Sequence, residues 1–210
     1  MRMGRRRLTR SHKERRRPGQ MTTREKILDV AYRSFADKGY NRTSMGSIAE
    51  ELGITRPALY YHFASKEDLL LATYKTVDPL KGVNADDVLA STSIEQYRRE
   101  LNALIASITS NLHDDEQRNR FVATVESASS QIPAVLQSAR AQYDATCAIF
   151  KAAIEHGRGI GALPAKLDAD TAKQYLSAYI YGVGDILLRG SKIDIDATRN
   201  MVIEGLFNEG

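Results

Sequence analysis

Helical periodicity runs through almost the whole chain from Thr22 onward, and no segment shows sustained alternation of apolar and polar residues. The clearest case is a stripe of apolar residues that recur every three or four positions between residues 94 and 112. Residues 179–183 have a strand-like composition, but their neighbours continue the helical period. We therefore expect an all-α protein of about nine helices.

Charge is distributed unevenly along the 210 residues. Residues 1–20 carry nine basic groups and one acidic group, residues 21–78 carry eight of each, and residues 79–210 carry 13 basic and 17 acidic groups. The basic run is typical of a disordered arm that contacts nucleic acid, although Met21 could equally be the true start of the protein. The chain thus divides into a basic arm over 1–21, a middle segment over 22–78 and a C-terminal domain over 79–210 that opens with a linker at 79–92.

Several classes of protein do not fit the sequence. The apolar runs are far shorter than the ~18 residues of a membrane span, and the basic N-terminus lacks the apolar core of a secretory signal. Cys147 is the only cysteine, which excludes an internal disulfide and fits a reducing compartment. The four histidines show no metal-ligand spacing, and the glycine-rich segment 157–162 lacks the preceding strand that a dinucleotide-binding motif requires. We expect a cytoplasmic protein without cofactor, metal or membrane partner, and not an enzyme.

Two short helices joined by a turn at residues 53–55 have the outline of a helix-turn-helix. Leu59 and Phe63 share one face of the second helix and are expected to be buried. An arginine on the open side can make two hydrogen bonds to a guanine edge, while hydroxyl and imidazole groups can reach phosphates. The side chains on the open face and its flanks are Arg56, Pro57, Ala58, Tyr60, Tyr61 and His62.

Lys66 stands in the first turn of the next predicted helix, where a cation opposes the helix dipole. A phosphate bound jointly by Lys66 and the free backbone N–H groups of that turn would explain this position. An ordinary solvated lysine would give the same sequence.

The stretch from Ile27 to about Tyr74 resembles the N-terminal domain of the tetracycline-repressor (TetR) family. The resemblance implies a homodimer whose recognition helices read a palindromic double-stranded DNA operator about 34–36 Å apart. It rests on Gly39, Tyr40, Thr43, Ile48, Ala49, Gly53, Ile54, the run from Leu59 to Phe63, Lys66 and Leu69. By position, it implies a DNA-binding domain over 22–78 with its helix-turn-helix over 44–63. It also implies phosphate contacts by Thr43 and Lys66, base contacts by Arg56, and further DNA contacts by Ser44, Thr55, Pro57, Ala58, Tyr60, Tyr61 and His62.

In this family the remaining helices bind a small-molecule effector and form the dimer. Effector candidates are polar residues that interrupt apolar stripes, namely His113, Thr124, Glu126, Gln131, Tyr143, Cys147 and Tyr179. The apolar stripe over 172–187 is too wide for a helix of a monomer, which favours a four-helix interface with the last helix, 195–207. The expected interface residues are Tyr175, Tyr179, Val183, Ile186, Leu187, Val202 and Leu206.

The sequence thus predicts a sequence-specific transcriptional regulator. The expected form is a homodimeric repressor that an effector of unknown identity releases from its operator. The alternative is an effector-independent or architectural DNA-binding protein that relies on the basic arm.

Overall fold

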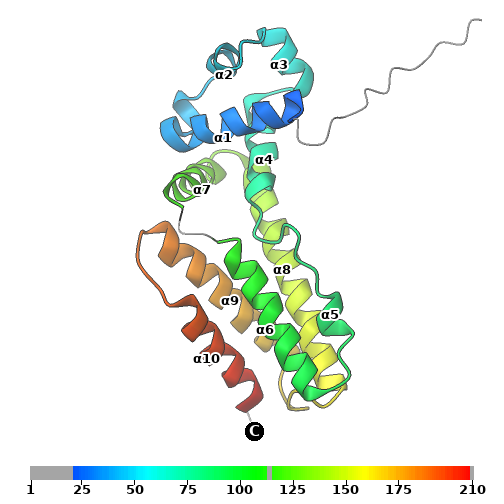
Figure 1. Cartoon of the computed structure of the whole chain (residues 1–210). Helices are drawn as coiled ribbons and strands as arrows, with labels where there is room; N and C mark the ends of the chain where they lie inside the picture. Colours follow the sequence, from blue (N-terminus) through cyan, green and yellow to red (C-terminus); the bar gives the residue numbers. More distant parts are fainter. Residues whose placement is uncertain (1–20, 113–114, 209–210) are drawn as a thin grey trace, which may run out of the picture.

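The computed structural model describes residues 21–112 and 115–208, and within these ranges the chain is helical and has no strand (Figure 1). This confirms the all-α prediction. The short helix α5 is additional to the expected nine and lies inside the predicted linker at 79–92. The elements of the two ranges are α1 Thr23–Arg42, α2 Met45–Glu51, α3 Arg56–His62, α4 Lys66–Tyr74, the 3₁₀ turn η1 Lys75–Val77, α5 Asp86–Leu89, α6 Ile94–Ser110, α7 Glu116–Ser129, α8 Pro133–Gly159, α9 Ala169–Leu188 and α10 Ile195–Asn208.

Local sequence signals set the ends of the first four helices. The hydroxyls of Ser44 and Ser65 accept backbone hydrogen bonds and cap α2 and α4. Gly39 interrupts α1 with a φ of 74°, and Gly53 turns the chain between α2 and α3 with a φ of 65°. Both angles lie in the left-handed region that favours glycine. Gly39 therefore kinks α1, which ends at Arg42, and Gly53 forms the predicted turn of the helix-turn-helix.

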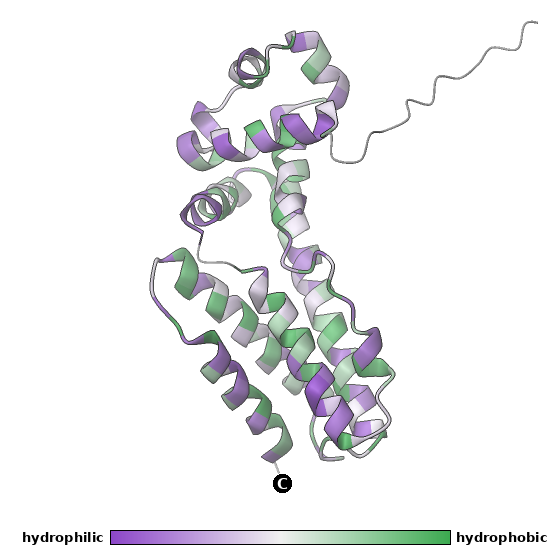
Figure 2. Ribbon diagram, viewed as in Figure 1, coloured by the Kyte–Doolittle hydropathy of each residue, from purple (hydrophilic) through white to green (hydrophobic). Residues whose placement is uncertain are grey.

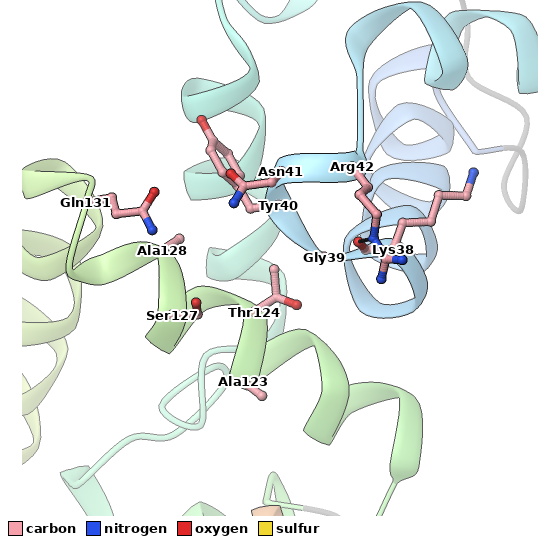
Figure 3. Close-up of a pocket in the computed structure, with 10 residues that line it drawn as sticks. All are labelled: Lys38, Gly39, Tyr40, Asn41, Arg42, Ala123, Thr124, Ser127, Ala128 and Gln131. Carbon is pink, nitrogen blue, oxygen red and sulfur yellow. Dashed lines mark hydrogen bonds between the residues drawn. The ribbon is translucent and has the colours of Figure 1, made fainter.

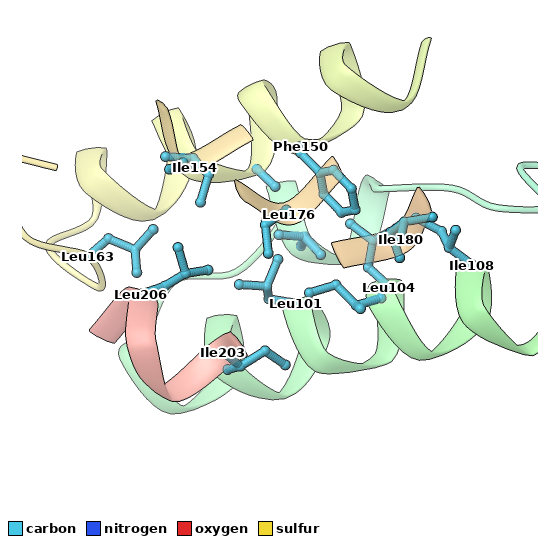
Figure 4. Close-up of a cluster of buried hydrophobic side chains, with 14 of the residues drawn as sticks. Leu101, Leu104, Ile108, Phe150, Ile154, Leu163, Leu176, Ile180, Ile203 and Leu206 are labelled. Carbon is cyan, nitrogen blue, oxygen red and sulfur yellow. The ribbon is translucent and has the colours of Figure 1, made fainter. Parts of the chain in front are cut away.

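The lower part of the molecule is a bundle of α6, α8, α9 and α10, with α5 against one end (Figure 1). Its long helices have an apolar and a polar side (Figure 2). The apolar sides meet in one core, in which the labelled side chains come from all four helices and the loop after α8 (Figure 4). No helix in the described part of the chain is long and apolar enough to cross a membrane.

A second core lies under the helix-turn-helix and is not made by the N-terminal helices alone. Ile27, Phe35 and Leu69 of α1 and α4 are fully buried there. They share the core with Phe121 and Val125 of α7, because α1 packs along α7. Helix α7, although it follows residue 79, therefore completes the hydrophobic core of the end that carries the helix-turn-helix.

Gly157 lets α6 and α8 approach each other closely. The ring of Tyr97 on α6 is fully buried, and its hydroxyl donates a 3.0 Å hydrogen bond to the Ala153 carbonyl. A Cβ on Gly157 would lie 2.4 Å from the ring carbon Cζ of Tyr97. Although a glycine often ends a helix, α8 continues through Gly157 to Gly159, so Gly157 serves close packing and not a turn.

We predict that Gly157→Ala lowers the free energy of unfolding by about 1–3 kcal/mol, because the buried Tyr97 ring has no room to move. Urea denaturation followed by circular dichroism measures this change. Gly159→Ala is the matched control, since no atom lies within 4 Å of its Cβ position. Equal stability of the two variants would contradict the packing argument.

Candidate DNA-binding surface and effector cavity

Helix α3 presents an open face at one end of the molecule (Figure 1). Leu59 and Phe63 are buried, as predicted. Tyr61 on the opposite side is 87% exposed, and Tyr60 is 49% exposed. Pro57 and Ala58 are also exposed, and His62 is half-buried. The small residues therefore leave the first turn of α3 accessible, with the two tyrosines in the turn that follows.

Arg56 begins α3 and connects it to α2. Its guanidinium rests against Gly46, where a Cβ would lie 2.6 Å from the nearest nitrogen. The side chain is exposed, and within the described residues it makes no hydrogen bond or ion pair. Thr55 caps the helix by accepting a 3.3 Å hydrogen bond from the Ala58 N–H. Ser44, which caps α2, is exposed beside this surface.

The structure does not support the expected phosphate contact by the Thr43 side chain. Thr43 is 1% exposed, and its hydroxyl donates to the carbonyls of Ser34 and Gly39 at 3.0 and 2.8 Å. Both acceptors are backbone carbonyls of α1, so the hydroxyl holds the residue that follows α1 against that helix. Its hydroxyl is therefore used inside the protein.

Lys66 also points back to the end of α1. Its ammonium donates to the carbonyls of Tyr40 and Thr43 at 2.9 and 3.1 Å and lies 4.1 Å from the centre of the Tyr40 ring. Burial lowers the pKa of Lys66. A phosphate is thus not needed to explain this cation, because it caps the C-terminal carbonyls of α1, where the dipole favours positive charge.

A cavity of about 390 Å³ lies between the two ends of the molecule. Apolar side chains form most of its wall. This volume falls in the range of small-molecule sites. Its polar and charged lining residues include Tyr74 of α4, Arg118, Glu126 and Ser129 of α7, Gln142 and Thr146 of α8, and Tyr181 and Asp185 of α9.

Tyr74 connects this cavity to α4. Its hydroxyl donates a 3.0 Å hydrogen bond to Gln142 Oε1, and Gln142 Nε2 donates to Asp78 Oδ1 at 2.9 Å. Burial raises the pKa of Tyr74 to about 12, so the phenol stays protonated and remains a donor at neutral pH. The end of α4 is thereby tied to α8 across the cavity wall.

Among the effector candidates, only Glu126 lines this cavity, and its exposed side chain lies on α7. Thr124 and Gln131 instead line a separate hollow of about 350 Å³ between residues 38–42 of α1 and α7 (Figure 3). The Thr124 hydroxyl donates to the Phe35 carbonyl at 3.1 Å, which ties α7 to α1. His113 lies outside the described residues.

Three further candidates do not line the cavity either. Tyr143 is exposed on α8, with its ring 5.4 Å from that of Tyr181. Cys147 contacts the Ser177 hydroxyl at 3.4 Å. The Tyr179 hydroxyl donates to the Ile195 carbonyl at 3.0 Å and holds α9 to the start of α10. Several polar residues that interrupt apolar stripes thus join neighbouring helices. The same criterion missed Tyr74, Arg118 and Gln142, which line the cavity.

Several expected dimer residues are part of the protomer's own core. Val183, Leu187 and Leu206 are at most 4% exposed. Val202 and Tyr179 are half-buried and pack against the same core, and Ile186 is half-buried. Tyr175 alone of the expected set is well exposed, at 45%. The apolar stripe of α9 is wide because α9 packs against α6, α8 and α10 of the same protomer. The sequence-based prediction assigned these contacts to a partner subunit.

We predict that Lys66→Met lowers the free energy of unfolding by about 1–2 kcal/mol, because two helix-end carbonyls lose a charged donor while the methylene stem is kept. Chemical denaturation measures the change. The control is Lys75→Met at the end of α4, an exposed lysine with no hydrogen bond or ion pair to a described residue. If both variants lose the same stability, Lys66 is an ordinary surface lysine.

Comparison with known proteins identifies the N-terminal domain. Residues 27–73 match the family described as bacterial regulatory proteins, tetR family. The regulator AcrR of Shigella flexneri is 53% identical over 47 residues, a match that spans 22% of each protein. The transcriptional repressor BepR of Brucella suis is 25% identical over 177 residues, which cover 81% of this chain and 82% of BepR.

The fold of most of the chain is similar to that of solved structures. The crystal structure of the regulator FadR of Bacillus subtilis in complex with stearoyl-CoA has a TM-score of 0.67, with 21% identity over 87% of this chain and 97% of FadR. This likeness extends beyond α4 to the helices of the C-terminal bundle. The chain therefore carries the N-terminal domain of the TetR family of bacterial regulatory proteins.

Proposed function

We propose that the chain is a homodimeric repressor that binds a palindromic operator through α3 and leaves it when a small molecule enters the cavity beside Tyr74. The observation that carries this proposal is a single cavity whose wall includes residues of α4 and α7 as well as residues of α8 and α9 in the C-terminal bundle. Tyr74 belongs to α4, whose first residue, Lys66, is bonded to the end of α1, and whose Leu69 lies in the core under the helix-turn-helix. The FadR structure with stearoyl-CoA illustrates that this fold accommodates a small molecule.

The cavity wall and the core of the DNA-binding end share side chains. Val125 and Val135 belong to both. A ligand that displaces these side chains or Tyr74 therefore changes the packing of α1 and α4. In a dimer, this change would alter the distance between the two recognition helices. The ligand shifts the protein only if it binds the DNA-incompetent form more tightly, and typical couplings of this kind are about 1–3 kcal/mol.

Operator binding is tested by fluorescence anisotropy of the purified protein on its own upstream DNA, beside a scrambled duplex at about 150 mM salt. The proposal expects at least ~10³-fold preference for the native fragment. Equal affinity for both duplexes, with a steep salt dependence, would indicate binding without sequence preference and would contradict the repressor assignment.

For the same assay, we predict that Arg56→Ala weakens binding to the native fragment by about 1–3 kcal/mol and changes binding to the scrambled duplex much less. The physical reason is the loss of a guanidinium that stands free at the start of α3. Arg140→Ala is the matched control, since Arg140 is an exposed arginine on α8 without a bonded partner among the described residues. An equal loss on both duplexes would mean that Arg56 contacts only phosphates.

We propose that the dimer forms through the outer face of α9, because Val183, Leu187 and Leu206 of the expected interface are buried inside the protomer. This outer face carries no charge over several turns, and a Cβ on the neighbouring Gly205 of α10 would lie 3.4 Å from the Tyr175 hydroxyl. Met201 of α10 is 73% exposed. The exposed, uncharged residues of α9 are Gln174, Tyr175, Ala178, Tyr181 and Gly182.

We predict that Gly182→Arg converts the dimer into a monomer at micromolar concentration, as measured by sedimentation velocity. Apart from the backbone of α9 itself, no atom of the described residues lies within 4 Å of the Cβ position, so the variant is expected to fold. Gly159→Arg, which has equally open surroundings at the end of α8, should remain dimeric. A wild-type protein that sediments as a monomer would remove the dimer from the proposal.

A further inference from the structure

Arg118 is the cation in the wall of the effector cavity, and it is placed at an energetic disadvantage. It stands in the first turn of α7, where the helix dipole disfavours positive charge. The guanidinium is half-buried and makes no hydrogen bond or ion pair with any residue in 21–112 or 115–208. Burial lowers the pKa of Arg118, and the nearby Tyr32, Tyr74 and Asp115 oppose this only in part.

The carboxylate closest in sequence does not act as its partner. Asp115 caps α7 by accepting hydrogen bonds from the backbone N–H groups of Gln117 and Arg118, at 2.9 and 3.4 Å. A desolvated guanidinium without an ion pair is costly, because its water is lost and nothing replaces it. A bound anion would supply the missing partner.

The acidic groups of the cavity lie elsewhere or are already neutralised. Asp185 is held by Arg189 through two hydrogen bonds of 2.8 and 2.9 Å. Glu126 is two turns further along α7, about 12 Å from Arg118 along the helix axis. The two ends of the α7 face in the cavity therefore carry opposite charges, with apolar Val122 and Val125 between them.

Resting on the proposed function, we propose that the effector is an amphipathic anion: an acid with an apolar body, whose carboxylate or similar anionic group pairs with the Arg118 guanidinium while the body fills the space beside Val122 and Val125. The anion lies next to Arg118 and away from Glu126, so the charges of the wall fix its direction. A neutral or cationic molecule of the same shape gains the apolar contacts and lacks the ion pair. Such a pair in a half-buried site is worth about tenfold in affinity or more.

The test compares three probes with the same ten-carbon chain: decanoate, decan-1-ol and decyltrimethylammonium. Isothermal titration calorimetry on the full chain, without DNA and at about 150 mM salt, gives each Kd. The proposal expects decanoate to bind about tenfold or more tightly than decan-1-ol, and decyltrimethylammonium to bind most weakly. In Arg118→Gln the advantage of decanoate over decan-1-ol disappears, while the affinity for decan-1-ol changes by no more than about twofold.

Three variants make the result specific. Arg118→Lys keeps the charge and should retain most of the preference for decanoate, although it loses the two-pronged geometry. Arg118→Glu should reverse the preference in favour of decyltrimethylammonium. Arg140→Gln removes an exposed arginine outside the cavity and should leave all three affinities unchanged. Circular dichroism and thermal melting confirm that each variant is folded.

Equal binding of decanoate and decan-1-ol to the wild-type protein would overturn the assignment, as would a decanoate preference that survives Arg118→Gln. Failure of all three probes to bind would overturn it as well. None of these outcomes bears on operator recognition, because the calorimetry contains no DNA. Conversely, a protein that prefers decanoate in the predicted way but ignores its upstream DNA would contradict the repressor proposal and leave the anion site intact.

Discussion

The rest of the structure depends on the packing of α1 against α7. Phe121 is fully buried, with its ring centre 5.0 Å from that of Tyr32, and it fills a core that α1 to α4 do not close by themselves. The Thr124 hydroxyl bonded to the Phe35 carbonyl fixes the same contact. Because a small helical domain has little apolar surface to bury, borrowing a helix from the other half adds stability and also couples the two halves. The next turn of α7, at Val125, forms a wall of the cavity.

This arrangement gives a physical route from ligand to DNA without a long chain of intermediates. A close-packed interior does not absorb an inserted molecule by small uniform adjustments, so a displaced side chain moves its neighbours as a unit. In the proposed mechanism, the residues that a ligand displaces include Tyr74 on α4, whose hydroxyl is bonded to Gln142. At the other end of α4, Lys66 is bonded to the carbonyls of Tyr40 and Thr43. The helix is thus anchored at both ends, and we expect motion at one anchor to reach the other.

The sequence was sufficient for the features that depend on near neighbours. The helical period, the turn at residues 53–55 and the burial of Leu59 and Phe63 all follow from spacings of a few residues. Features that depend on which helix lies opposite were not accessible. Apolar character predicted that Leu187 and Leu206 are covered, but it could not tell whether a neighbouring helix or a second subunit covers them. A cavity is harder still, since it is space left unfilled by segments far apart in the chain.

Lys66 and Arg118 show why one local signal requires the tertiary structure for its interpretation. Both are cations in the first turn of a helix, and both are unfavourable by the same dipole argument. Lys66 reaches two carbonyls more than 20 residues earlier in the chain, so its apparent misfit is resolved within the protein. Arg118 faces a cavity and finds no partner in the described chain, so the same misfit is left for a ligand to resolve. A misplaced charge in a sequence therefore indicates that a partner is needed, and only the fold distinguishes an internal partner from an external one.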